Sequence, residues 1–108
     1  MLKLCNIDIE HCQEIYKRLN KFLCRLKKRF AITAVYLYGS FAKEEVHEGS
    51  DIDLVIVGNF KGRMFERIEE ILKLTELPIE PLVYTQKEFL RLKNKSFLRE
   101  IIKTAKLL

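Results

Sequence analysis

The chain has 108 residues, which fits one domain, and we expect a single domain over residues 1–108. Its composition, 48% hydrophobic and 32% charged, excludes a disordered chain. No apolar stretch approaches the roughly 20 residues of a membrane span, and the first residues lack a secretory core, so the sequence predicts a cytoplasmic protein without a membrane partner.

Four elements are predicted in the first part of the chain. Asp8 is a plausible N-cap for a helix whose apolar stripe runs to about Arg29. The β-branched and aromatic residues 33–38 predict a strand, and Gly39-Ser40 turns it into a short helix over about 41–45. After a loop at 47–50, the apolar residues 52–57 predict a buried strand.

The second half continues the alternation of helices and strands. We predict a helix over 64–74, with Phe65, Ile68, Ile71 and Leu72 on one face, and a strand over 79–84. Pro81 cannot donate to a β-ladder, so this strand should lie at a sheet edge or be paired on one side there. Thr85 to Glu88 form a capping box for another helix. Ser96 caps a last helix, whose inward residues would be Phe97, Leu98, Ile101, Ile102 and Ala105. The order predicts an α/β fold, a small mixed sheet of three or more strands flanked by helices.

Two aspartates open the second predicted strand. Asp51 and Asp53 are two residues apart, so on a strand they point to the same side, roughly 6.5–7 Å apart at Cα. Two unpaired carboxylates this close raise each other's pKa. A divalent cation relieves that repulsion, and Mg²⁺ binds through one or two carboxylates together with substrate phosphates.

Two further features are predicted to join this pair. If the second and third strands are neighbours with their ends in register, Glu80 meets the aspartates, and three carboxylates can hold two Mg²⁺ ions, or Mn²⁺. Gly39-Ser40 stands at a strand-to-helix turn, where free N–H groups bind phosphate.

Each of these residues also has a purely structural interpretation. Asp51 could close the turn after Gly49-Ser50, Gly39-Ser40 could be a simple helix cap, and Glu80 could face solvent. For Asp53, an unpaired carboxylate within an apolar strand would be costly without a function. Lys43 and Ser50 are balanced between phosphate contact and no role, and we interpret Tyr36 and Tyr38 as core aromatics.

These residues together resemble the DNA-polymerase-β-like nucleotidyltransferase superfamily. The resemblance rests on Gly39-Ser40, Asp51-Ile52-Asp53 with apolar flanks, and Glu80, and it covers roughly residues 30–90. The short chain and the run Tyr38 to Lys43 are most similar to the minimal nucleotidyltransferases. The resemblance implies a polymerase-β palm-like fold and transfer of a nucleoside monophosphate, as AMP from ATP, to a hydroxyl.

The same resemblance implies roles for individual residues. Asp51 and Asp53 would bind both metals, and Glu80 would complete the acceptor-side metal site and help to deprotonate the acceptor. Gly39 and Ser40 would contact the β- and γ-phosphates, with Lys43 and Ser50 as further phosphate contacts. Family members commonly carry Arg-Gly where this chain has Lys43-Glu44, so a point charge replaces the arginine fork.

The resemblance also suggests a partner, a small helical ribonuclease toxin that this protein would modify as its antitoxin. The alternative is a catalytically silent antitoxin that neutralises the partner by docking. Fourteen bases lie in two segments, residues 17–29 and 87–106, and these could form the partner interface or a homodimer. A third interpretation, a nucleic-acid-binding module driven by these bases, has no aromatic-basic motif to support it.

Overall fold

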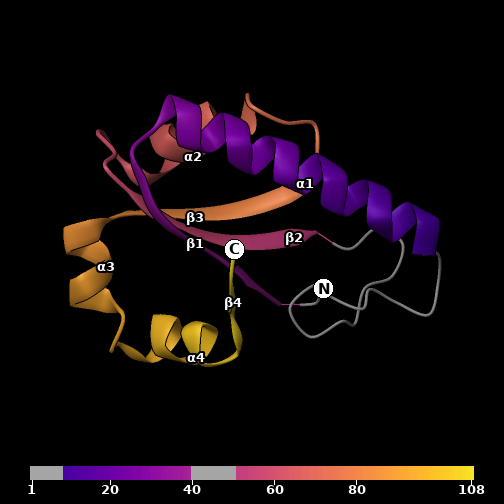
Figure 1. The fold of residues 1–108 in the computed structure, drawn as a ribbon. Helices are drawn as coiled ribbons and strands as arrows, with labels where there is room; N and C mark the ends of the chain where they lie inside the picture. Colours follow the sequence, from indigo (N-terminus) through magenta and orange to yellow (C-terminus); the bar gives the residue numbers. More distant parts are fainter. Residues whose placement is uncertain (1–8, 40–50) are drawn as a thin grey trace.

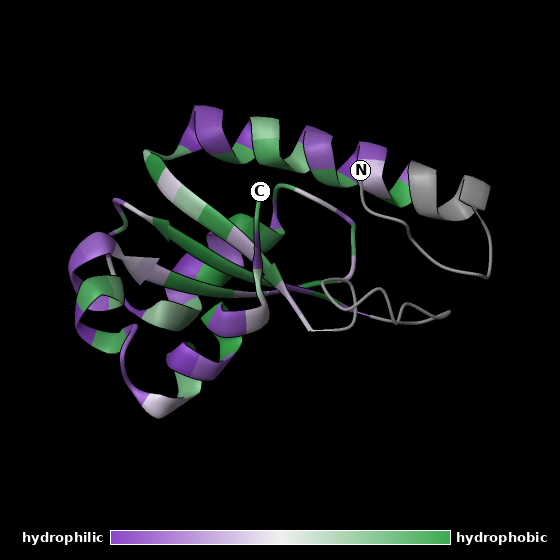
Figure 2. Cartoon of the chain, turned by 60° about the horizontal axis from the view of Figure 1, so that its bottom comes forward, coloured by the Kyte–Doolittle hydropathy of each residue, from purple (hydrophilic) through white to green (hydrophobic). Residues whose placement is uncertain are grey.

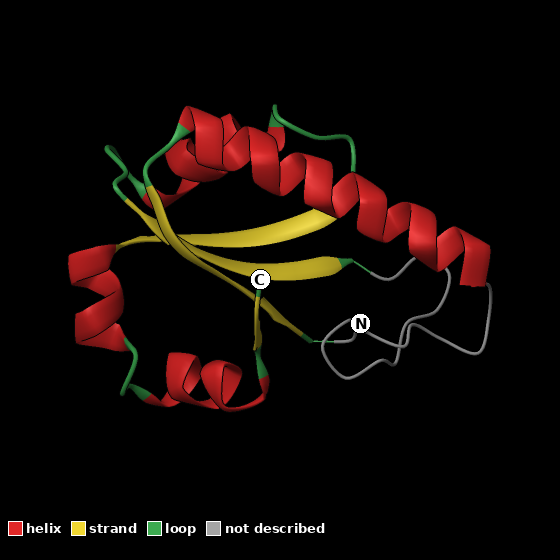
Figure 3. Cartoon of the chain, in the orientation of Figure 1, coloured by secondary structure: helices red, strands yellow, loops and turns green. Residues whose placement is uncertain are grey.

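The computed structural model describes residues 9–39 and 51–108, with side chains from residue 14 onward in the first helix. Within these ranges the chain forms four helices and four strands (Figure 3). In chain order they are α1 (Ile9–Arg29), β1 (Ile32–Tyr38), β2 (Ile52–Gly58), α2 (Met64–Leu72), β3 (Ile79–Thr85), α3 (Gln86–Leu92), α4 (Ser96–Thr104) and β4 (Lys106–Leu107). The helix predicted over 41–45 and the proposed cap Asp8 fall outside the described residues.

The four strands form one mixed sheet in the order β3-β2-β1-β4. β1 is antiparallel to β2 and to β4, whereas β2 and β3 are parallel and are joined through α2. The prediction that the Pro81 strand lies at an edge is confirmed, because β3 pairs with β2 alone. The two-residue β4 was not predicted, since so short a segment carries no periodic pattern.

Helices cover both faces of the sheet (Figure 1). α1 and α2 lie over one face, and α3 and α4 lie over the other. On the α1 side the core is built from the helix residues Leu19, Phe22 and Leu26 and the strand residues Val35, Leu37, Ile52, Leu54 and Ile56. On the α3 and α4 side a smaller core contains Val55, Val57, Tyr84 and Leu98. The predicted α/β sandwich is therefore confirmed.

The first helix follows its predicted pattern closely. Hydropathy alternates along α1 in Figure 2, as expected for a helix with one apolar stripe. Leu19, Phe22 and Leu26 are buried, while the basic residues between them are exposed. Within the described ranges, no helix has both the length and the apolar composition needed to cross a membrane.

The predicted inward face of α2 is partly wrong. Phe65 and Leu72 are 60% and 41% exposed, and the helix ends at Leu72, two residues earlier than predicted. The reason is Arg67, which is only 8% exposed and shares the buried side of the helix with Ile71. A prediction that counts only apolar residues places Arg67 on the exposed side. It therefore assigns the wrong residues, Phe65 and Leu72, to the buried face of the helix.

The buried guanidinium of Arg67 has partners that explain its position. Its Nη1 donates to Glu88 Oε1 at 2.6 Å and to the Val83 carbonyl at 3.2 Å, and Nη2 reaches Glu88 Oε2 at 3.4 Å. Glu88 also accepts from the Thr85 N–H at 2.8 Å, while Thr85 Oγ1 accepts from the Glu88 N–H at 3.1 Å. The predicted capping box is thus confirmed, and the ion pair ties α2 to α3 across the end of β3.

The last helix starts one position away from its prediction. Lys95 occupies the N-cap and Ser96 is the first helical residue. Leu98 is buried as expected, but Phe97 is 64% exposed rather than inward. The helix packs on this side of the sheet through Leu98 and Ile101, and Phe97 points outside this contact.

Candidate active site

The sheet aligns three of the site's side chains in one row across neighbouring strands. Tyr38 of β1 is paired with Asp53 of β2, which is paired with Glu80 of β3. Side chains alternate along a strand, and the residues that follow Asp53 alternate between the two cores. Asp53 therefore shares a face with Val55 and Val57, which is the face that α3 and α4 cover. The strand adjacency expected for Glu80 is confirmed.

Asp51 joins this row from the position directly before β2. The N–H of Ile52 donates to the Pro78 carbonyl at 2.8 Å, which fixes the start of β2 against the segment that leads into β3. A side-chain hydrogen bond to Asp51 is the largest of the interactions that raise the pKa of Glu80. The three acids thus meet at one end of the sheet, where β2 and β3 begin.

Among the described residues, the acids of this row have no basic counter-charge. Burial raises the pKa of Asp53 above 3.8, and the nearby Asp51 raises it further, while a hydrogen bond from Glu80 opposes the shift. The charges of Asp51 and Asp53 raise the pKa of Glu80 above 4.5, in addition to the hydrogen bond with Asp51. No basic side chain is among the causes of either shift. Such a site favours a proton or a cation.

Tyr38 belongs to this site, which the sequence interpretation as a core aromatic did not foresee. Burial, followed by the charges of Asp53 and Glu80, raises the pKa of Tyr38 to about 12. The phenol therefore stays protonated beside the acids. The sequence contained no indication that Tyr38 lies beside Asp53, because the long segment between β1 and β2 leaves the register of the two strands open.

Gly39 follows Tyr38 and contacts the same acid. Its φ of 73° lies in the left-handed region. A Cβ at this position would collide with Asp53 Oδ2 and come within 3.1 Å of Asp53 Cγ. We predicted that glycine is needed for close approach to a phosphate. The structure shows a first reason that needs no ligand, since only glycine leaves room for the Asp53 carboxylate.

The other residues predicted to bind phosphate, Ser40, Lys43 and Ser50, lie outside the described residues. In the part of the chain with described side chains, no three acidic, histidine or cysteine groups are arranged to hold a metal ion directly. The donor set nevertheless fits Mg²⁺ chemically, because this ion prefers carboxylate oxygens as ligands. The repulsion between the acids, which raises the pKa of Asp53 and of Glu80, would also be relieved by a bound cation. Asp51, Asp53 and Glu80 are the residues that would hold such an ion.

A cavity of about 520 Å³ adjoins the row of acids. It is lined by Tyr38 and Gly39 at the end of β1, and by one face of α4 with Phe97, Glu100 and Ile101. Volumes of this order accommodate small-molecule ligands. The sequence did not assign α4 to the site, because only the packing of α4 against β1 brings it there.

Two solved structures share this fold. A protein assigned as a nucleotidyltransferase from Sulfolobus solfataricus superposes with a TM-score of 0.67 at 20% identity, covering 92% of this chain and 83% of its own. A toxin–antitoxin structure with AMP-PNP superposes with a TM-score of 0.56 at 17% identity, covering 82% of this chain and 69% of its own. At these identities the likeness establishes the fold alone.

Comparison by sequence gives the family. A search of curated proteins found no significant match. The sequence model of the nucleotidyltransferase domain matches residues 16–107, which include both aspartates, Glu80 and the helices on either side of the sheet. The chain therefore belongs to the nucleotidyltransferase domain family.

Proposed function

We propose that the protein transfers AMP from ATP to a hydroxyl group on a partner protein, with two Mg²⁺ ions, or Mn²⁺, as cofactors. The observation that carries this proposal is the meeting of Asp51, Asp53 and Glu80 at one sheet end, where no basic side chain of the described residues shifts the pKa of Asp53 or Glu80. The family and the adjoining cavity support it. The site is proposed to work in the cytoplasm.

In the proposed reaction, the acceptor oxygen forms a bond to the α-phosphorus of the nucleotide. The bond from that phosphorus to the bridging oxygen breaks, and pyrophosphate leaves with the electron pair. The metal ions, when bound, would neutralise the triphosphate and lower the pKa of the acceptor hydroxyl. Asp51 and Asp53 would hold them, and Glu80 would help to take the hydroxyl proton.

The nucleotide has room beside the acids. The cavity is lined by Tyr38, Gly39 and α4, and Gly39 lies against the Asp53 carboxylate, so a ligand that reaches Gly39 would approach this acid. Gly39 is proposed to contact the phosphates, together with Ser40, Lys43 and Ser50. The raised pKa of Tyr38 keeps its hydroxyl a neutral hydrogen-bond donor at this boundary.

The nature of the partner rests on one neighbour. The toxin–antitoxin structure contains AMP-PNP, and this supports both a nucleotide ligand and a protein partner for the present chain. We therefore propose a small helical toxin as the acceptor. The same neighbour favours the alternative function, an antitoxin that neutralises its toxin by docking without any transfer.

The test combines the protein with α-labelled ATP, Mg²⁺ or Mn²⁺, and the product of the neighbouring gene. We expect the label on the partner and release of pyrophosphate. Asp53→Asn should lower the rate by at least about 100-fold, since it removes charge that stabilises the transition state. The control Glu69→Gln removes an exposed acid from α2 and should leave the rate unchanged.

Two outcomes would count against transfer. If the wild-type protein labels no partner with any common nucleoside triphosphate, the enzymatic proposal fails. If the complex with the partner also forms equally well with Asp51→Asn and Asp53→Asn, neutralisation by docking is the better account.

A further inference from the structure

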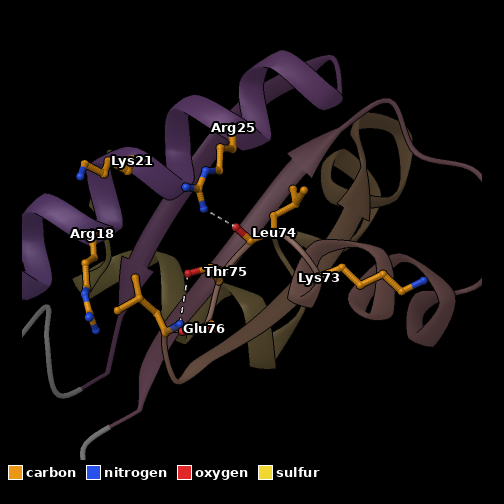
Figure 4. Close-up of a pocket in the computed structure, with 8 residues that line it drawn as sticks. Arg18, Lys21, Arg25, Lys73, Leu74, Thr75 and Glu76 are labelled. Atoms are coloured by element: carbon orange, nitrogen blue, oxygen red, sulfur yellow. Dashed lines mark hydrogen bonds between the residues drawn. The ribbon is translucent and has the colours of Figure 1, made fainter.

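A second concave surface lies on the other face of the sheet, between α1 and the segment that enters β3. Its cavity is about 520 Å³ in volume and is lined by Arg18, Lys21 and Arg25 of α1 and by residues 73–77 (Figure 4). We call this surface the α1 groove. It does not share a lining residue with the cavity beside the acids.

The charge of the α1 groove comes from a regular stripe on one helix. Arg18, Lys21 and Arg25 follow the spacing i, i+3, i+7, which places them on one side of α1. At a rise of about 1.5 Å per residue they are about 4.5 and 6 Å apart along the helix axis. Over residues 14–29, the helix carries seven bases and one acid, Glu14.

These three bases are not neutralised by the fold. Their side chains are exposed, and among the described residues none of the three forms an ion pair with a carboxylate. Arg25 Nη1 donates to the Leu74 carbonyl at 3.1 Å, so one arginine is held against the opposite wall. Lys73 instead pairs with Glu70 at 3.3 Å and extends away from α1 in Figure 4. Glu76 is the acidic residue in the lining.

The residues that line the α1 groove indicate whether its partner is an acidic protein or a nucleic acid. Protein interfaces have an apolar centre with aromatic anchors. The large apolar side chains in the α1 groove are Leu74, which is half-buried, and Leu77, which is buried. The exposed apolar side chains of the described chain, such as Phe97 and Phe65, lie elsewhere. Nucleic-acid interfaces are more polar and much more positive, which matches this surface.

We infer that the α1 groove binds the phosphodiester backbone of a nucleic acid. Arg18, Lys21 and Arg25 would each contact a phosphate, and the arginine forks suit its oxygens. Among the described lining residues there is no aromatic side chain to stack or read bases, so we expect binding that is independent of sequence. This inference does not depend on the transfer reaction.

The test measures the binding of a fluorescein-labelled 20-nucleotide single strand, as RNA and as DNA, between 50 and 200 mM salt. We expect wild-type binding that weakens steeply with salt. Arg18→Gln/Lys21→Gln should weaken binding at 50 mM salt at least about tenfold and lower the slope of log K against log salt by about 1.4, for two lost phosphate contacts. Equal binding of RNA and DNA fits backbone contact, and preference for RNA adds a 2′-hydroxyl contact.

The matched control removes the same charge elsewhere. Lys93→Gln/Lys95→Gln changes two exposed bases between α3 and α4 and should keep the affinity within about twofold of wild type. Asp53→Asn should also bind normally, which separates this site from the acids. Arg25 is left unchanged because it also contacts Leu74, and circular dichroism checks that each variant folds.

Three results would overturn the inference. Wild-type protein that binds neither strand at 50 mM salt would do so, as would a control that loses as much affinity as Arg18→Gln/Lys21→Gln. Polyglutamate of equal charge that displaces the strand as well as unlabelled RNA does would assign the groove to acidic proteins instead.

Discussion

The two ends of β3 carry acidic side chains in opposite electrostatic situations. Near the carboxyl end, Glu88 is held by the buried Arg67 and by the Thr85 N–H, which together lower its pKa. At the amino end, Glu80 is surrounded by Asp51 and Asp53, which raise its pKa. Glu88 is therefore stabilised in its charged form by the fold, whereas the described residues around Glu80 disfavour its charge. An acid that the fold leaves unpaired is a mark of a functional site.

The largest loss of stability should come from removing the ion pair between Arg67 and Glu88 near the carboxyl end of β3. Glu88→Ala leaves the guanidinium of Arg67, 8% exposed, without its counter-charge and removes the capping box of α3. We expect a loss of about 3 kcal/mol in the free energy of unfolding, at the lower end for buried pairs because Glu88 itself is 33% exposed. Urea unfolding at neutral pH measures it.

The control for this prediction is Glu100→Ala, which breaks the exposed pair with Lys103. It should change the free energy of unfolding by no more than about 0.5 kcal/mol. Equal effects of the two substitutions would show that the buried pair between Arg67 and Glu88 contributes no more to stability than an exposed ion pair.

Gly39→Ala should have the next largest effect on stability. The left-handed backbone costs about 1–2 kcal/mol with an L side chain, and the new Cβ displaces Asp53. Gly62→Ala is matched, because Gly62 has a φ of 80° but its Cβ would meet only Glu66 at 3.4 Å. Both variants should lose stability in thermal unfolding, and Gly39→Ala should lose more, because its Cβ also collides with Asp53.

Nucleotidyl transfer separates these two glycine variants. Gly39→Ala should lose at least about 100-fold in rate through the displaced carboxylate, and Gly62→Ala should keep the wild-type rate. Equal rates would mean that the position of Asp53 does not matter for the reaction.

The smallest expected change is a gain in stability when one acid of the candidate active site, Asp53, is neutralised. In the presence of EDTA at neutral pH, Asp53→Asn should stabilise the protein by about 0.5 kcal/mol, since it removes a partly buried charge and the repulsion from Asp51. The gain is small because the side chain keeps contact with solvent. Loss of stability would show that Asp53 makes a favourable contact in the free protein.

The pH dependence of that gain follows from the direction of the shifts. Asp53 and Glu80 have raised pKa values, so their contribution to stability is fully present below their ordinary values of 3.8 and 4.5 and is lost as pH rises through the raised values. Glu88 behaves oppositely, since its contribution is lost as pH falls through its lowered pKa. The advantage of Asp53→Asn should therefore disappear at about pH 3.5, as measured by unfolding in EDTA.

Much of the site was predictable because its parts are local. The spacing of Asp51 and Asp53 on an apolar strand indicates that they share a face, whatever the strand packs against. Glu80 needed one further assumption, that the second and third strands are parallel neighbours, and α2 is long enough to make that connection. Tyr38 needed the register of β1 against β2, which the long intervening segment leaves open.

Among the described residues, the sequence by itself determined the four helices and the three long strands to within about two residues, and which acids share a face, because these depend on residues two to four positions apart. Only the tertiary structure decided that Arg67 turns inward, that Phe97 turns outward and that Gly39 makes room for Asp53. The positions of Arg67 and Gly39 depend on a partner from a distant part of the chain, Glu88 for Arg67 and Asp53 for Gly39. Local periodicity carries no information on such partners, since packing and charge pairing across elements choose them.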